Sequence, residues 1–245
     1  MLFMNWIPLV SRRELLGAGL FAAGASPLFI ADRSARAERL SRSTLVTGPY
    51  VVVETAHGKV RGGHSRGALA FKGIPYGGSV SGVNRFKPAP PIESWTGVRD
   101  ALALGTPAPQ SAKTVYGEHE PPPGEECLVL NVWTPATDGR KRPVLFYNHG
   151  GGFSTGSAGS VVQDGGQLAA NHDVVVVASN HRLGIMGYLY LGEFGGDAYA
   201  ASGNVGMLDI VQALHGCIRT SRLSAATLTT SRCSANPGAA PRRLP

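Results

Sequence analysis

Hydrophobic and polar residues alternate in short runs along the first part of the chain body. The runs 51–54 and 58–61 flank a polar turn and predict a β-hairpin. The next apolar segment, 70–77, is interrupted by glycine and proline. Beyond it, residues 103–125 are rich in Pro, Gly and Glu, and they predict a long surface loop.

Three further apolar runs predict buried strands, at 127–133, 143–147 and 174–178. The last consists of four valines and an alanine, a composition typical of a parallel strand that is buried on both faces. The spacing becomes helical at 164–171 and again at 204–215. In the second helix the apolar positions that carry the prediction are Val205, Leu208, Val211 and Leu214. Strands that first pair locally and then alternate with helices indicate an α/β fold with a mixed, mostly parallel sheet.

Three consecutive glycines, Gly150 to Gly152, follow His149 directly after the 143–147 strand. Glycine loses more backbone entropy on folding than other residues, so the run indicates that backbone N–H groups face something at close range. Ester and acyl chemistry supplies one candidate, because such groups stabilise the oxyanion of a tetrahedral intermediate. A tight turn without catalytic use and a phosphate cradle stay open from these residues alone.

The formal net charge of +7 is concentrated at the two ends of the chain. Residues 1–37 carry +2, residues 216–245 carry +5, and residues 38–215 carry equal numbers of basic and acidic side chains. The body has no basic face with interleaved aromatic residues, so we expect no nucleic-acid partner.

The N-terminus predicts an export signal. Residues 11–16 form a twin-arginine pattern, and Ala35 and Ala37 suit a signal peptidase that would start the mature chain near Glu38. A membrane anchor fits less well, because the apolar run 15–30 contains proline and is shorter than a spanning helix. We therefore expect the twin-arginine export machinery as a partner and a periplasmic or secreted product with no stable membrane span.

Cysteine and histidine give no sign of a metal centre. Of Cys127, Cys217 and Cys233, the last two lie in the C-terminal segment 216–245, and we expect Cys127 to be an unpaired, buried thiol. None of the seven histidines has a partner at ligand-like spacing, so we expect no metal site and no cofactor.

Six blocks of the body stand in a recognisable order. They are FKGIPY at 71–76, NRFKP at 84–88, ECLVLNVWTP at 126–135, HGGGF at 149–153, NHRLG at 180–184 and GNVGMLD at 203–209. Together they resemble the N-terminal part of the type-B carboxylesterases, the family of para-nitrobenzyl esterases and cholinesterases. The chain departs from the family at His181, where the family usually has tyrosine. A flat ring with a polar tip is retained there, so we expect a local effect only.

The resemblance implies an α/β-hydrolase fold and serine-type hydrolysis of a small-molecule carboxylic ester. Gly151 and Gly152 would donate their N–H groups to the oxyanion, and His149 and Gly150 would support the loop. A second serine pattern occurs inside this loop, where Ser154 stands in a Gly-x-Ser-x-Gly match. A nucleophile elbow lies between a strand and a helix, so we do not expect Ser154 to be the nucleophile.

The resemblance stops after His215. The family continues with Ala-Leu-x-Trp-Val, a Gly-Gly-Asp-Pro segment and the nucleophile elbow Gly-Glu-Ser-x-Gly, and only the Ala-Leu start stands in this chain. Residues 216–245 contain no acidic residue and are rich in Arg, Ser, Ala and Pro. This composition is common where GC-rich DNA is translated in the wrong frame.

A choice of synonymous codons for residues 223–242 supports that interpretation. Read in the overlapping frame, these codons encode FGGDPDNVTLFGESGGGAK, which contains the family's elbow. The pair Gly216-Cys217 becomes Trp-Val if one T is restored after the His215 codon. We therefore expect a one-nucleotide deletion, in the gene or in its sequencing. The chain would consist of an export signal (1–37), the N-terminal part of an α/β-hydrolase domain (38–215) and a disordered, out-of-frame tail (216–245).

Such a chain keeps the oxyanion loop but has no nucleophile, acid or base, so we expect an ester hydrolase by descent that is inactive as encoded. We also expect the 174–178 strand to present an open apolar edge, because the strand that leads into the elbow is missing, and the product to be poorly soluble. Two alternatives stay open: a non-catalytic, esterase-like interaction protein and a short periplasmic binding protein.

Overall fold

The computed structural model describes residues 47–110, 120–223 and 232–235, with side chains from 48 to 217 apart from that first gap. The predicted export signal at 1–37 and most of the predicted tail lie outside the described residues. The three domain boundaries therefore stay predictions.

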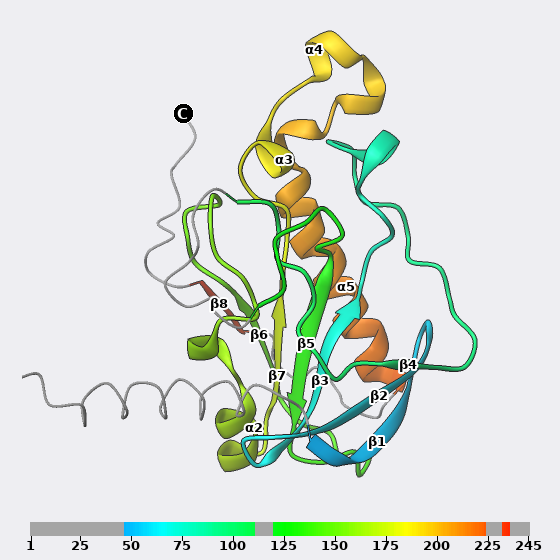
Figure 1. Ribbon diagram of the computed structural model, residues 1–245, viewed down its shortest axis with the longest axis vertical. Coiled ribbons are helices and arrows are strands. Elements are labelled where there is room, and N and C mark those ends of the chain that lie inside the picture. Colours follow the sequence, from blue (N-terminus) through cyan, green and yellow to red (C-terminus); the bar gives the residue numbers. More distant parts are fainter. Residues whose placement is uncertain (1–46, 111–119, 224–231, 236–245) are drawn as a thin grey trace, which may run out of the picture. The chain divides into compact units, whose positions relative to one another are not determined.

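Eight strands of the described residues form one mixed sheet, in the order β1-β2-β3-β5-β7-β6-β8, with β4 beside β2 (Figure 1). The strands are β1 (Thr47–Thr55), β2 (Gly58–Ser65), β3 (Ala68–Pro75), β4 (Val98–Asp100), β5 (Val129–Thr134), β6 (Val144–Asn148), β7 (Val175–Ser179) and β8 (Arg232–Ala235). Along this order the pairs from β1 through β2, β3 and β5 to β7 are antiparallel, whereas β7, β6 and β8 are parallel, as are β2 and β4. The predicted hairpin and the predicted mixed sheet are confirmed.

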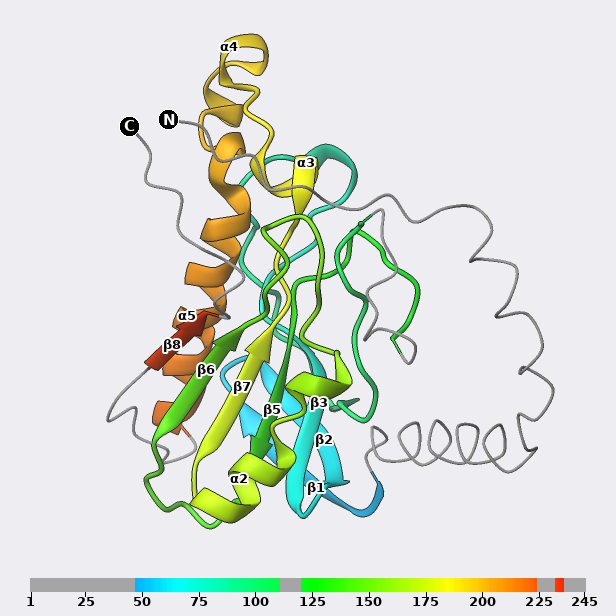
Figure 2. The ribbon, with the colours of Figure 1, turned by 90° about the vertical axis from the view of Figure 1, so that its left-hand side faces the viewer.

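Helices lie on both faces of this sheet, α2 on one face and α5 on the other (Figures 1 and 2). The helices are α2 (Gly166–His172), α3 (Gly184–Tyr188), α4 (Gly192–Gly195) and α5 (Val205–Leu223), with 3-10 turns at Gly82–Asn84, Val161–Gln163, Asp197–Tyr199 and Ser202–Asn204. Both helices predicted from the sequence are therefore present. The described parts of the 103–125 stretch contain no helix or regular strand, as expected of a loop, but Pro107 and Ala108 in it are buried.

The central strands alternate their side chains between two cores. On the α2 face, Trp133 of β5 and Val176 of β7 pack with Ala169 of the helix. On the α5 face, the buried residues and their partners come from the positions between these: Leu130, Val132, Val144, Phe146, Val175 and Val177, with Ile210 and Ala213 of α5. Successive residues of a strand point to opposite faces, so one set of strands serves both cores.

The expected open edge at 174–178 is wrong. β7 lies inside the sheet, because it pairs with β5 on one side (Val177 with Val132) and with β6 on the other (Val177 with Phe146). The strand next to the tail is β6, and its outer edge pairs with β8. The prediction of poor solubility loses the premise on which it was based.

The buried face of α5 also differs from the predicted one. Val205 is fully buried, as expected, but Leu208 and Val211 are 37% and 44% exposed. The helix instead turns Asp209 and Ala213 inward, and both are 0% exposed. Because the buried face includes the polar Asp209, the pattern of apolar residues predicted a face that is rotated by part of a turn from the observed one.

Two further expectations concern thiols and membranes. Cys127 is buried and unpaired, as predicted, and burial raises its pKa to about 12. Within the described residues, no helix combines the length and the apolar character needed to cross a bilayer.

Candidate functional site

The glycine run lies at the carboxyl end of β6, at the edge of the sheet where the parallel strands β6, β7 and β8 all end. In open α/β sheets, ligands bind outside this edge. His149 is the first residue after β6 and is 7% exposed, whereas Gly151 and Gly152 are exposed. His149, which we expect to support the loop, is therefore buried, and these two glycines lie at the surface.

The backbone of the loop requires glycine at two positions. Gly151 has φ +124°, and a Cβ added there would overlap the carbonyl oxygen of Thr155. Gly156 has φ +111°, and a Cβ there would overlap the carbonyl oxygen of Gly150. The N–H groups of Ser154 and Thr155 both donate to Gly151 O at 3.2 Å, which closes the turn.

The N–H groups of Gly151 and Gly152 are not used by this turn. Across residues 47–110 and 120–223, neither donates a hydrogen bond. A Cβ at Gly152 would meet no atom of the described chain within 4 Å, so the space beside this residue is open. Two unused, exposed backbone donors on a fixed turn are what binding of an anionic oxygen needs.

A pair of stacked imidazoles lies beneath the loop. The rings of His149 and His181 are 4.7 Å apart and nearly parallel, with an interplanar angle of 5°. His149 Nδ1 lies 3.0 Å from Gly150 O, and His181 Nδ1 lies 3.0 Å from Arg182 O. Burial, with the charge of His181, lowers the pKa of His149 to about 4, and burial also lowers the pKa of His181. Both rings are therefore neutral at neutral pH, which allows them to stack.

The segment after β7 holds the loop from the other side. Gly184 N donates to Phe153 O at 2.7 Å, and the Phe153 ring contacts the Tyr188 ring at 5.2 Å. Phe153 itself has φ +62°, a conformation that costs a non-glycine residue about 1–2 kcal/mol. The contacts with Gly184 and Tyr188 offset that cost. His181 thus lies in direct contact with His149, and the local effect that we expect of this departure stays a prediction.

Three side-chain amides, to which no role is assigned from the sequence, bind the backbone of Gly156 and Ala158 just after the glycine loop. Asn180 Oδ1 accepts from Ala158 N at 2.7 Å, and its Nδ2 donates to Thr106 O at 3.1 Å. Asn131 donates to Ala158 O at 3.1 Å. Gln110 accepts from Gly156 N at 2.9 Å and donates back to Gly156 O at 3.0 Å. A polar residue inside an apolar strand was the available signal for Asn131, whereas nothing around Gln110 distinguished it.

A buried ion pair connects the end of β7 to α5. Arg182 Nε and Nη2 donate to the two carboxylate oxygens of Asp209, at 2.8 and 2.7 Å. The remaining Arg182 Nη1 donates to Lys87 O at 2.7 Å. The side chains of Arg182 and Asp209 are 2% and 0% exposed. This bidentate pair fixes α5 relative to the site.

The structure places Ser154 in the turn and not between a strand and a helix. Its side chain is exposed, and its hydroxyl lies 3.4 Å from Gly152 O. Within the described ranges, no three His, Cys, Asp or Glu side chains gather in a way that could hold a metal ion.

A mixed sheet with helices on both faces, and a glycine loop at the carboxyl end of a parallel strand, defines the α/β-hydrolase fold. Solved α/β-hydrolase enzymes resemble this chain in structure: a carboxylesterase of Geobacillus stearothermophilus has a TM-score of 0.69 and 40% identity, and the match covers 75% of this chain and 37% of that one. The model of the carboxylesterase family matches residues 49–216, and the chain belongs to that family.

Two curated relatives give the same result. The para-nitrobenzyl esterase of Bacillus subtilis (strain 168) is 40% identical over 167 residues, which are 67% of this chain and 34% of the relative. The phenmedipham hydrolase of Pseudarthrobacter oxydans is 38% identical over 175 residues, with 69% of this chain and 34% of the relative covered. The chain thus spans about a third of the length of the curated relatives that it matches.

Proposed function

We propose that residues 47–215 carry the oxyanion half of a serine carboxylic ester hydrolase. The observation that supports this most directly is the pair of unused, exposed N–H groups at Gly151 and Gly152 on a fixed turn. In the complete reaction a serine, deprotonated by a histidine that a carboxylate orients, attacks the ester carbonyl. The two glycine N–H groups hold the oxyanion that forms, and losing one such donor typically costs about 3 kcal/mol of transition-state stabilisation.

The 245 residues do not complete this reaction, because they contain no Gly-Glu-Ser-x-Gly elbow. The elbow lies in the overlapping frame, and two observations support this. The family match ends at residue 216, directly after His215. The recovered serine codon straddles the codons of Asn236 and Pro237, so the serine would come directly after the chain positions that β8 occupies here, whose residues the restored frame replaces.

Export belongs to the proposal as well. The twin-arginine pattern at 11–16 directs the chain out of the cytoplasm, so the small-molecule ester would be met in the periplasm or outside the cell. Replacing both arginines with lysine should leave a tagged chain in the cytoplasmic fraction. Continued export of that variant would end this part of the proposal.

Two forms of the protein test the activity. One is the 245-residue chain, and the other is encoded by the same DNA with one nucleotide restored after the His215 codon. We expect the restored form to hydrolyse p-nitrophenyl acetate and the 245-residue chain to release no p-nitrophenol above background. Resequencing of the locus decides whether the deletion exists in the gene.

The oxyanion role is tested in the restored form by Gly151→Ala, which displaces the turn. We expect kcat to fall by about a hundredfold or more with little change in KM, because the donors act on the transition state. Ser154→Ala is the matched control in the same loop and should keep its activity. Turnover by the 245-residue chain that Ser154→Ala abolishes would overturn both the inactivity and the oxyanion assignment.

A further inference from the structure

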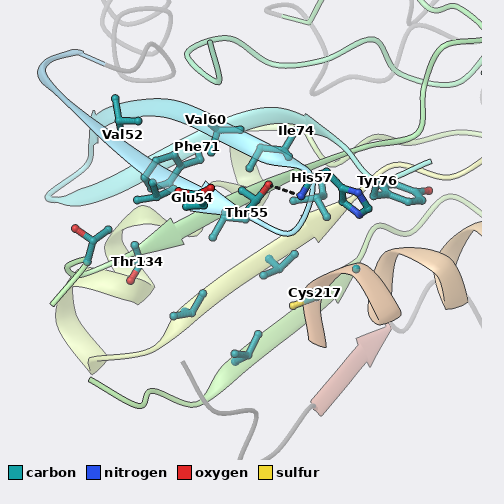
Figure 3. A pocket seen from close by; sticks show the side chains of 18 of the residues that line it. Val52, Glu54, Thr55, His57, Val60, Phe71, Ile74, Tyr76, Thr134 and Cys217 are labelled. Atoms are coloured by element: carbon teal, nitrogen blue, oxygen red, sulfur yellow. Dashed lines mark hydrogen bonds between the residues drawn. The ribbon is translucent and has the colours of Figure 1, made fainter. Parts of the chain in front are cut away.

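A cavity of about 540 Å³ lies at the amino ends of β6 and β7, away from the glycine loop (Figure 3). Figure 3 shows it between the first strands, which carry Val60, Phe71 and Ile74, and the end of α5 that carries Cys217. We propose that this cavity is a binding site for a neutral, flat aromatic molecule of one or two rings.

The walls of the cavity are apolar over most of their extent. Every central strand contributes to them, and the residues are Leu130 and Val132 of β5, Val144 of β6, and Val175 and Val177 of β7. Ligand pockets typically have volumes of about 300–1,000 Å³, and an apolar cavity of about 150 Å³ is enough to bind benzene. The cavity therefore has room for a fused two-ring system.

One wall is open because of a glycine. Gly216 lies on α5 beside Cys217, and both line the cavity. A Cβ added at Gly216 would meet a single atom of the described chain outside its helix within 4 Å, Cβ of Tyr76 at 3.9 Å. The helix thus directs no side chain from this position into a space that is bordered by apolar residues.

Both arginines at the rim and two of its threonines are already paired within the chain, which bears on the charge of the ligand. Arg142 donates from Nε to Asp173 at 2.7 Å and from both terminal nitrogens to Asp138. Thr55 Oγ1 donates to Gly58 O at 2.7 Å, and Thr134 Oγ1 donates to Ala136 O at 2.9 Å.

The aromatic and acidic groups at the rim lead to the same choice. Tyr76 OH donates to Asn180 O at 2.6 Å, so the tyrosine presents carbon to the cavity. The exposed carboxylate of Glu54 would repel an anion at the rim. An apolar cavity whose two rim arginines are both paired favours a neutral ligand.

Protection of Cys217 tests the proposal in the chain as it exists. The purified 245-residue protein is alkylated with N-ethylmaleimide, with and without indole, and the modified cysteines are assigned by peptide mass spectrometry. At an indole concentration several times its Kd, we expect alkylation of Cys217 to slow by about fivefold. Cys127, which is buried, serves as an internal reference, and benzoate serves as the anionic counterpart that should not protect.

Two variants of α5 locate the site. Gly216→Trp should fill the cavity from within, protect Cys217 without indole and remove the effect of added indole. His215→Trp adds the same ring to the exposed neighbouring position and should behave like the parent chain. Gly216→Leu provides a smaller side chain with the same expected direction if the tryptophan variant does not fold.

The outcomes separate clearly. A change in the Cys217 rate of less than about twofold with indole in the parent chain overturns the proposal, whether or not the chain is folded. Equal protection by benzoate overturns the choice of a neutral ligand. Undiminished protection by indole in both Gly216 variants shows that indole binds elsewhere and also overturns it. None of these outcomes depends on esterase activity.

Discussion

The two ends of β6 and β7 are stabilised in different ways. At the carboxyl ends, Asn180, Arg182 and His149 are buried, and each makes directed polar contacts or ring stacking. At the amino ends, Val144 and Val175 border a cavity of about 540 Å³. A hydrogen bond at the carboxyl ends needs only two groups, and the described chain contains both. Apolar packing at the amino ends needs side chains from every neighbouring element to fill the space between them. The polar contacts at the carboxyl ends are therefore formed, whereas the amino ends border an unfilled cavity.

The largest expected effect is at the carboxyl end, where Asp209→Ala leaves Arg182 buried without its partner. Breaking a buried ion pair in this way should lower the free energy of unfolding by about 3–5 kcal/mol, measured by urea denaturation. Asp100→Ala is the matched control, because its pair with Arg61 is exposed and screened by solvent, so its loss should change stability far less. Equal losses in the two variants would contradict the role given to the Arg182–Asp209 pair.

A second test changes the pH. His149 has a pKa of about 4 in the folded chain and about 6.5 when unfolded, so between these values the unfolded state binds more protons. The free energy of unfolding should therefore fall as the pH drops from about 6.5 to about 4, by on the order of 3 kcal/mol from this group, and be fully retained above that window.

Ring-proton NMR titration follows His149 directly, with free histidine as the reference under the same conditions. His181→Tyr removes one of the causes of the shift, so the pKa of His149 should rise while burial keeps it below its ordinary value. A His149 that titrates at its ordinary pKa of about 6.5 would show that the stacked pair does not form in solution.

Substituting alanine for one glycine at each end of β6 and β7 compares the stability of the two ends directly. Gly151→Ala forces a side chain into the Thr155 carbonyl and should cost about 1–3 kcal/mol of stability. Gly216→Ala enters free space in a helix and should stabilise by about 1 kcal/mol. Gly152→Ala, with φ +62° and open space, should cost about 1–2 kcal/mol. If Gly216→Ala destabilised the chain as much as Gly151→Ala, the cavity would not be present in solution.

The smallest effect is expected for Ser154→Ala, in the same loop as Gly151. Its exposed hydroxyl makes one long contact, so the free energy of unfolding, measured by urea denaturation, should change by less than about 0.5 kcal/mol. Loss of activity in the frame-restored enzyme through this substitution alone would make Ser154 the nucleophile and would refute the assignment of the elbow to the other frame.

The helices and strands were predicted more accurately from the sequence than the order in which the strands pair in the sheet. The glycine loop, the hairpin and the valine-rich strand were each visible in a short window, because local residue types and their spacing determine them. The position of β7 between β5 and β6 was not visible, since strand order depends on contacts far apart in the chain. The prediction of an open edge at 174–178 was wrong for that reason.

The supports of the site were only partly predictable. His149 was assigned to the loop because of its position after a strand. Asn180 and Gln110 received no role, because a buried amide has meaning only once its partners, such as Ala158 N and Gly156 N, are close to it. The helix face was misassigned at Leu208 and Val211 because an ion pair, and not an apolar stripe, orients α5.

Gly216 connects the structure of the folded chain with the proposed change of its reading frame. In the reading frame that we propose as the original one, this codon would read tryptophan, and the helix would carry an indole ring at the position beside the cavity. The proposed one-nucleotide deletion would then also have removed one large side chain from the core. A loss of one nucleotide could be recognised by calorimetry or by ligand rescue, as volume missing from a protein, before any DNA was sequenced.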